Sequence, residues 1–213
     1  MPGIRDVTLI PKQPFMVELS SNYYKYVVNA FGISHFYSFF VKDTDTISIS
    51  VPDGCIDMMI HYNKSRTCVG ADFYGTDLLP HSMKVFKGCT HFGVRFLPGY
   101  VPAFVDASMP EMIDRIIPFP EIAKGHDLPA IVAEQDQFMD QIGAFMQFYL
   151  KYYEKSVYDP YRTKFGLIAE IVKAYGNIRV EELSERTNYS VSYIDKIFLH
   201  EIGISPKSFS NIL

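Results

Sequence analysis

The hydrophobic pattern of this chain changes period part-way along, and that change constrains the fold more than any other feature. Up to about residue 119, apolar residues alternate with other residues in short runs separated by turn residues, which is typical of β-strands. These runs cover 34–41, 46–51, 55–62, 84–89 and 92–97. From Pro129 onward, apolar residues recur every three or four positions, which is the helical period. The chain is therefore predicted to be an α+β protein with its strands first and its helices last.

The short, closely spaced strands favour a small cupin-like barrel or sandwich over residues 1–122. The run 55–62 shows the pattern best, because one of its two sets of alternating residues is wholly apolar: Ile56, Met58, Ile60 and Tyr62. Pro98 and Gly99 end the last strand of this part. We expect this β-rich domain to bind a small-molecule effector.

A helical linker is expected over residues 123–158, with one long helix at 129–155. Its apolar ridge consists of Phe138, Ile142, Phe145, Tyr149 and Tyr152. Residues at such spacing lie on one helix face. Two interpretations of that face are open: it packs against the β-domain, or it forms the seam of a homodimer.

Residues 159–213 are predicted to form a helical DNA-binding subdomain. A helix that begins at Asp159-Pro160 ends at Gly176-Asn177, and two further helices, 180–187 and 191–200, are joined by a tight turn. The outward face of the second helix can enter a major groove. The candidate DNA contacts are Ser190, Ser192, Tyr193, Asp195 and Lys196. The same helix–turn–helix shape also occurs in purely structural bundles.

Three short motifs in this subdomain resemble the first helix-turn-helix of the AraC/XylS family of transcriptional regulators: 180–184, 190–198 and 203–206. Upstream, 52–57 and 93–99 resemble the N-terminal domain of one AraC-like subgroup. The resemblance implies a DNA-binding transcription regulator, controlled by an effector and not an enzyme. It also implies self-association through the linker region.

The sequence departs from the family pattern in three places. Arg179 stands at the usual Ser or Thr cap of the first short helix, and Lys196 stands where the family usually has Arg. Family members carry a second helix-turn-helix after a connecting helix, whereas this chain ends at Leu213. We therefore expect the sequence to be truncated after the first helix-turn-helix.

The charge distribution restricts any nucleic-acid contact to a local surface. The formal net charge is −4, and residues 161–213 contain seven basic and six acidic residues. Phosphate binding requires clustered Lys and Arg. The chain has no apolar run of membrane-spanning length and no signal core, and its three cysteines lack a CxxC spacing. We expect a cytoplasmic protein with no membrane contact.

The candidate effector residues are Tyr62, Arg95 and Phe96. Arg95 has two possible roles, because it can receive an anionic effector or pair with Asp57 in an adjacent strand. For the β-rich domain as a whole, a further interpretation is that it binds a protein instead of a metabolite.

The alternative function is a metal-dependent cupin-type enzyme, in which His61, His81 and His91 would share one ion. These histidines lack the His-x-His pair and following Glu of such sites. We therefore expect neither a metal nor a cofactor.

Overall fold

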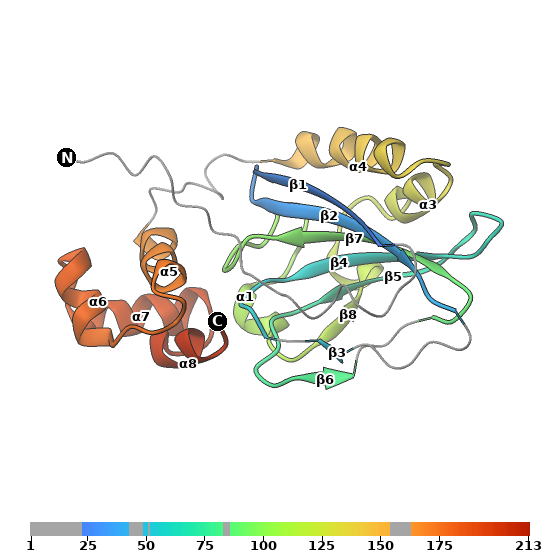
Figure 1. Ribbon diagram of the computed structural model, residues 1–213. Helices are drawn as coiled ribbons and strands as arrows, with labels where there is room; N and C mark the ends of the chain where they lie inside the picture. The colour runs from blue at the N-terminus through green and yellow to red at the C-terminus, as the bar shows by residue number, and fades with distance from the viewer. Residues whose placement is uncertain (1–22, 43–48, 51, 83–85, 154–162) are drawn as a thin grey trace.

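The computed structural model describes residues 23–42, 49–50, 52–82, 86–153 and 163–213. The fold is α+β, with most strands before the helices (Figure 1). The strands are β1 (Tyr24–Ala30), β2 (Ile33–Phe40), β3 (Ile49–Ser50), β4 (Asp57–Tyr62), β5 (Cys68–Tyr74), β6 (His81–Ser82), β7 (Thr90–Phe96) and β8 (Ile116–Pro118). The helices are α1 (Met109–Met112), α2 (Phe119–Ile122), α3 (Leu128–Ala133), α4 (Phe138–Tyr152), α5 (Thr163–Lys173), α6 (Val180–Thr187), α7 (Val191–Glu201) and α8 (Pro206–Asn211).

Six strands form one antiparallel sheet in the order β1-β2-β7-β4-β5-β8, and β3 pairs with β6 in a separate two-stranded sheet. Within the described residues, β1 and β8 are the edges of the larger sheet and do not pair with each other. The sheet is therefore established, whereas closure into a cupin-like barrel stays a prediction.

One face of the sheet carries the main hydrophobic core. The apolar residues Met58, Ile60 and Tyr62 of β4 lie on this face, together with Phe92 and Val94 of β7. Helices α3 and α4 pack here, and Phe145 of α4 meets Phe36 of β2 edge-on at a centroid separation of 5.5 Å. Burial of so many aromatic and aliphatic side chains supplies the main driving force for folding.

The predicted linker helix at 129–155 is instead two helices within the described residues. Helix α3 ends at Ala133 and α4 begins at Phe138. The four residues between them are polar, and Gln137 has the extended backbone of an N-cap. The predicted ridge from Phe138 to Tyr152 lies wholly within α4, so hydrophobic spacing located this helix but contained no signal for the break before it.

Strand prediction was correct for the central strands and for the described part of 46–51, where β3 lies, and it was wrong elsewhere. Residues 86–89 form a turn instead of a strand, and 83–85 lie outside the described residues. Strands β1 and β5 were missed, because β1 is an exposed edge strand and β5 is interrupted by Gly70 and Asp72. These sequences lack the apolar alternation that marked β4.

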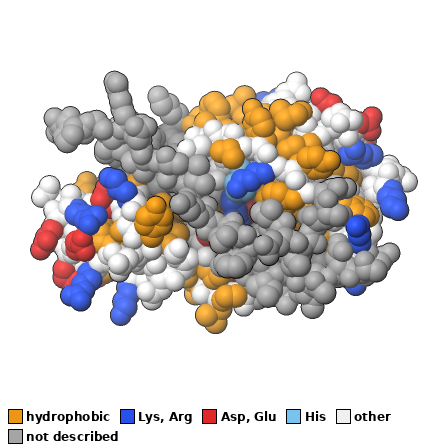
Figure 2. Space-filling model, viewed as in Figure 1, with side chains coloured by type: hydrophobic (Ala, Val, Ile, Leu, Met, Phe, Trp, Pro, Cys, Tyr) orange, Lys and Arg blue, Asp and Glu red, His pale blue; other side chains and the backbone are white. Residues whose placement is uncertain are grey.

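Helices α5 to α8 form a group at one end of the molecule (Figure 1). The predicted stop after α5 is confirmed, since Gly176 has a φ of +73° and its N–H donates to the carbonyl of Ile171 at 3.0 Å. Lys, Arg, Asp and Glu side chains are interspersed over these helices on the face shown in Figure 2. None of the helices in the described ranges is both long and apolar enough to cross a membrane.

Candidate functional site

The sheet face opposite the main core carries a row of buried polar side chains, which we call the polar face. It comprises His35, Tyr37, Asp57, His61, Asp72, His91 and Arg95. Buried polar groups are costly unless they find partners, so their contacts define what this face can do.

Arg95 is the centre of one cluster on the polar face. Its Nε and Nη2 form a fork on the carboxylate of Asp57, with the shortest contact 2.7 Å from Nη2 to Oδ2. Its Nη1 donates to Oδ2 of Asp53 at 2.6 Å. The predicted Asp57–Arg95 pair is therefore confirmed. Asp53 is a second partner that the sequence did not suggest, because it lies in the turn before β4.

The electrostatics of this cluster follow from burial of three charged groups together. Burial lowers the pKa of Arg95, but the two carboxylates outweigh burial and hold that pKa well above its usual value. Burial also raises the pKa of Asp53, although Arg95 opposes the shift. Tyr37 donates its hydroxyl hydrogen to Asp57 Oδ1 at 3.0 Å, and burial raises the pKa of that hydroxyl well above normal. Arg95 is thus engaged by protein carboxylates, and its predicted effector contact stays untested.

A second cluster on the polar face is a row of two histidines and an aspartate. His91 Nε2 lies 3.3 Å from the carbonyl oxygen of Phe86, the two Nδ1 atoms of His91 and His61 lie 2.6 Å apart, and His61 Nε2 lies 3.2 Å from Asp72 Oδ2. Both ends of the row are acceptors, so three hydrogen bonds require three N–H donors, whereas two neutral imidazoles supply two. The row is fully hydrogen-bonded only when it holds one further proton, but burial and the neighbouring His61 lower the pKa of His91 to about 3, so His91 does not supply this proton near neutral pH.

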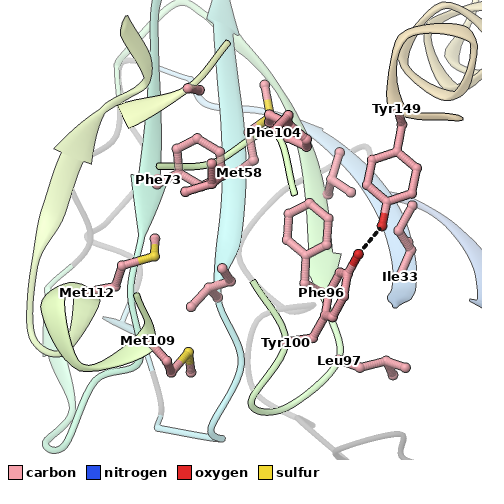
Figure 3. Close-up of a cluster of buried hydrophobic side chains, with 14 of the residues drawn as sticks. Ile33, Met58, Phe73, Phe96, Leu97, Tyr100, Phe104, Met109, Met112 and Tyr149 are labelled. Atoms are coloured by element: carbon pink, nitrogen blue, oxygen red, sulfur yellow. Dashed lines mark hydrogen bonds between the residues drawn. The ribbon is translucent and has the colours of Figure 1, made fainter. Parts of the chain in front are cut away.

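Tyr62 and Phe96 do not join Arg95. Tyr62 points into the main core, where its hydroxyl accepts from Gln141 Nε2 at 2.9 Å. Phe96 lies beside Tyr100 and Tyr149, whose hydroxyls are 2.8 Å apart (Figure 3). The expectation that these three residues share one site is thus corrected. Neighbouring residues in a strand point to opposite faces, so the pair Arg95 and Phe96 already contained this signal.

The histidines of the proposed metal site are only partly brought together. His61 and His91 are in contact, while the side chain of His81 lies outside the described residues. Across the described ranges, no three His, Cys, Asp or Glu side chains are grouped so that they could hold a metal ion.

Helix α4 buries the predicted ridge. Ile142, Phe145 and Tyr149 face the core, whereas Met139 and Leu150 are about half exposed, at 53% and 50%. Packing of this ridge against the β-domain is therefore confirmed, and a homodimer seam stays a prediction.

The second candidate site is the outer face of α7. Ser190 caps this helix by accepting a hydrogen bond from the N–H of Tyr193 at 3.3 Å. Asn188 adopts the left-handed conformation with φ 58°, and Ser184 Oγ donates to the Tyr189 carbonyl at 2.6 Å. These contacts fix the turn between α6 and α7.

Ile194, Ile197 and Phe198 are buried, as is Leu183 of α6, so this side of α7 packs into the core. The opposite face leaves Ser192, Tyr193 and Lys196 exposed and Asp195 half-buried. Tyr193 stacks at an angle against Tyr189, with centroids 5.2 Å apart. Four of the five candidate DNA contacts thus lie on one helix, and Ser190 precedes it as a cap.

The fold and its buried sheet face define an α+β protein with a polar-lined antiparallel sheet. The family model described as "Domain of unknown function (DUF6597)" matches residues 31–118, which run from the β1–β2 turn to the end of β8. No curated protein and no solved structure matched the chain.

Proposed function

We propose that the chain is a DNA-binding transcription regulator of the AraC type whose β-domain senses a small molecule. The observation that carries the proposal is the geometry of α6 and α7. Two short helices are joined by a tight left-handed turn, and the second presents a polar, exposed face. A helix of this kind fits the major groove, where base edges are distinguishable.

The N-terminal part adds a second, independent line of support. A domain of the matched kind is known in the N-terminal region of AraC-type regulators. The polar face lies within the matched residues and offers buried hydrogen-bonding groups to a small molecule. We infer that the effector contacts this face, and not the apolar face that carries Tyr62 and Phe96.

The ion pairs of the C-terminal helices determine the affinity and the salt dependence that we expect for DNA binding. Arg186 is paired with Glu182 and Glu170, and Lys164 with Glu201. Lys196 is exposed on α7. We therefore expect modest affinity with a small salt dependence, because few cations are free to replace counterions on phosphate.

The test is selection of bound sequences from a randomised double-stranded DNA library. Asp195→Ala should relax the preference at one base pair by ~1 to 3 kcal/mol, since a carboxylate can accept from cytosine. Lys196→Ala should weaken binding, because this lysine can donate to guanine or to phosphate. The matched control is Lys207→Ala, an exposed lysine on α8. No enrichment of any sequence, or equal behaviour of all three variants, would leave α6 and α7 as a structural pair.

The effector is tested separately with a metabolite library and thermal unfolding. A compound that raises the melting temperature should lose its effect in His61→Gln and keep it in Lys207→Ala. A shift that survives substitution of every polar-face residue would place the ligand elsewhere.

A further inference from the structure

The C-terminal helices touch the β-domain at three points where a glycine exposes its backbone. A Cβ placed on Gly54 would lie 2.6 Å from the ring of Phe209 in α8, and one on Gly99 would lie 2.6 Å from Ile168 in α5. A Cβ on Gly203, which follows α7, would lie 2.5 Å from Ile113 and 2.8 Å from Pro110. All three glycines have positive φ, so the close contacts coincide with turns that other residues rarely adopt.

A polar-face residue, Arg95, stabilises the turn that contains Gly54. Asp53, the preceding residue, accepts from Arg95 Nη1 at 2.6 Å and from the Cys55 N–H at 3.1 Å. On the other side, Thr76 Oγ1 donates to the Cys55 carbonyl at 3.0 Å. A buried ion pair therefore fixes the backbone against which Phe209 rests.

The same turn reaches the second contact point. The N–H of Gly99 donates to the Gly54 carbonyl at 3.2 Å, so a shift of the turn also moves the loop beneath Ile168. Phe209 in turn contacts Phe198 of α7 edge-on, at a centroid separation of 5.5 Å. These contacts form a continuous path from Arg95 through Gly54 and Phe209 to α7.

We propose that the Asp53–Arg95 ion pair is a positioning element that sets how α5 to α8 dock on the β-domain, so that a change of Arg95's partners is transmitted to α7. The pair does not need to touch DNA or an effector for this role. If the proposed function holds, this path is how an event on the polar face alters the DNA-facing helix, and that extension rests on the proposed function.

The chemistry of the cluster allows such a change without loss of the sheet. Arg95 makes a two-nitrogen fork with Asp57 in the neighbouring strand, but only one hydrogen bond with Asp53 in the turn. Loss of the Asp53 contact leaves the fork intact, so the turn can be released while β4 and β7 stay paired.

The experiment is amide hydrogen exchange of the whole chain, comparing Asp53→Asn with the unmodified protein. We expect about tenfold faster exchange in α8 and at the end of α7, where the N–H groups of Ile202 and Gly203 donate to the Phe198 carbonyl. Tenfold corresponds to ~1.4 kcal/mol of local stability. Amides of β4 and β7 should be unchanged. Asp72→Asn is the matched control, since it also removes a buried carboxylate from the polar face, but one whose hydrogen bond is to His61 of β4 and not to Arg95 or the turn.

A double substitution tests the path itself. If the ion pair acts through Phe209, then Asp53→Asn should add little to the exchange rates of Phe209→Ala. Unchanged exchange in α7 and α8, or an equal increase in β4 and β7, would overturn the proposal. Should Asp53→Asn not fold, Thr76→Val decides by the same measurement, because it removes the opposite support of the turn with little change of shape. Because hydrogen exchange is measured in the absence of DNA, its result does not depend on whether the chain binds DNA. Failure of the proposed function and failure of this inference can therefore be distinguished.

Discussion

Arg95 shows how one buried residue can organise a sheet face. It joins Asp57 of β4 to Asp53 of the preceding turn, and each of these three residues is buried. A buried charge is tolerated only while a partner is present, and removal of Arg95 would leave two buried carboxylates without their common partner in a low-dielectric environment.

We therefore predict that Arg95→Leu lowers the free energy of unfolding by ~3 to 5 kcal/mol. Urea unfolding measures this loss. Arg186→Ala is the control, because Arg186 is 43% exposed in its pair with Glu182, and exposed pairs contribute ~0 to 1 kcal/mol. Equal losses in the two variants would show that Asp53 and Asp57 do not depend on Arg95.

The histidines of the polar face make stability depend on pH. Burial, followed by repulsion from Arg95, lowers the pKa of His35 to about 3, and burial with the neighbouring His61 lowers that of His91 to about 3. Between the ordinary histidine value and these lowered values, the unfolded chain binds protons that the folded chain does not. The free energy of unfolding should therefore include a contribution from His35 and one from His91. Both contributions are fully present above about pH 6.5 and decrease as the pH falls.

For His35→Asn we predict a shallower loss of stability on acidification, by up to ~1.4 kcal/mol per pH unit below about pH 6.5. Urea unfolding from pH 8 to pH 5 gives the slope, and the difference at pH 8 measures lost packing alone. Burial raises the pKa of the Asp53 carboxyl, so this group favours the folded chain as the pH falls. Its contribution is present in both proteins and therefore does not affect the difference between their slopes. An unchanged slope would mean that His35 takes up its proton as readily in the folded protein as in the unfolded chain.

At the scale of single elements, α6 and α7 differ in how they begin. Ser190 accepts a hydrogen bond from the N–H of Tyr193, whereas Arg179, the cap of α6, makes no side-chain cap bond although its backbone is extended with φ −83° and ψ 153°. That backbone is the one from which Ser or Asp caps a helix.

Arg179→Ser should therefore stabilise the chain by ~1 kcal/mol, and Ser190→Ala should destabilise it by a similar amount. Thermal unfolding at constant pH measures both. Ser205→Ala, which removes the equivalent cap of α8, provides the reference for a capped helix in this subdomain. If Arg179→Ser has no effect, the N-terminus of α6 is already satisfied by solvent.

At the scale of the whole molecule, the sheet and the C-terminal helices share one core. The largest cluster of buried hydrophobic residues includes Phe36 of β2, Phe145 of α4 and Phe198 of α7. Parts that share a continuous core lose their stabilising contacts together, which favours a single cooperative transition.

We predict coincident unfolding of the two parts in urea. The sequence contains no Trp, so Tyr26→Trp in β1 and Tyr189→Trp before α7, both at exposed positions, report on each part by fluorescence. Two separate midpoints would show that the C-terminal helices fold as an independent unit.

The C-terminal helices were predicted well because their signals are local. The stop at Gly176 and the tight turn between 180–187 and 191–200 each depend on residues within a few positions of the backbone that they fix. The alternation in β4 likewise separated its two faces, with Tyr62 on one and Asp57 on the other.

The pairing of strands, the partners of Arg95 and the docking of the helices were decided only by the tertiary structure. Asp53 reaches Arg95 across 42 positions of sequence, and His61 reaches His91 across 30. No local pattern encodes such contacts, because they depend on register and on which strands become neighbours. Local backbone preferences therefore determined where the C-terminal helices and the central strands lie in the sequence, whereas burial of polar groups between distant strands determined the polar face and its connection to α7.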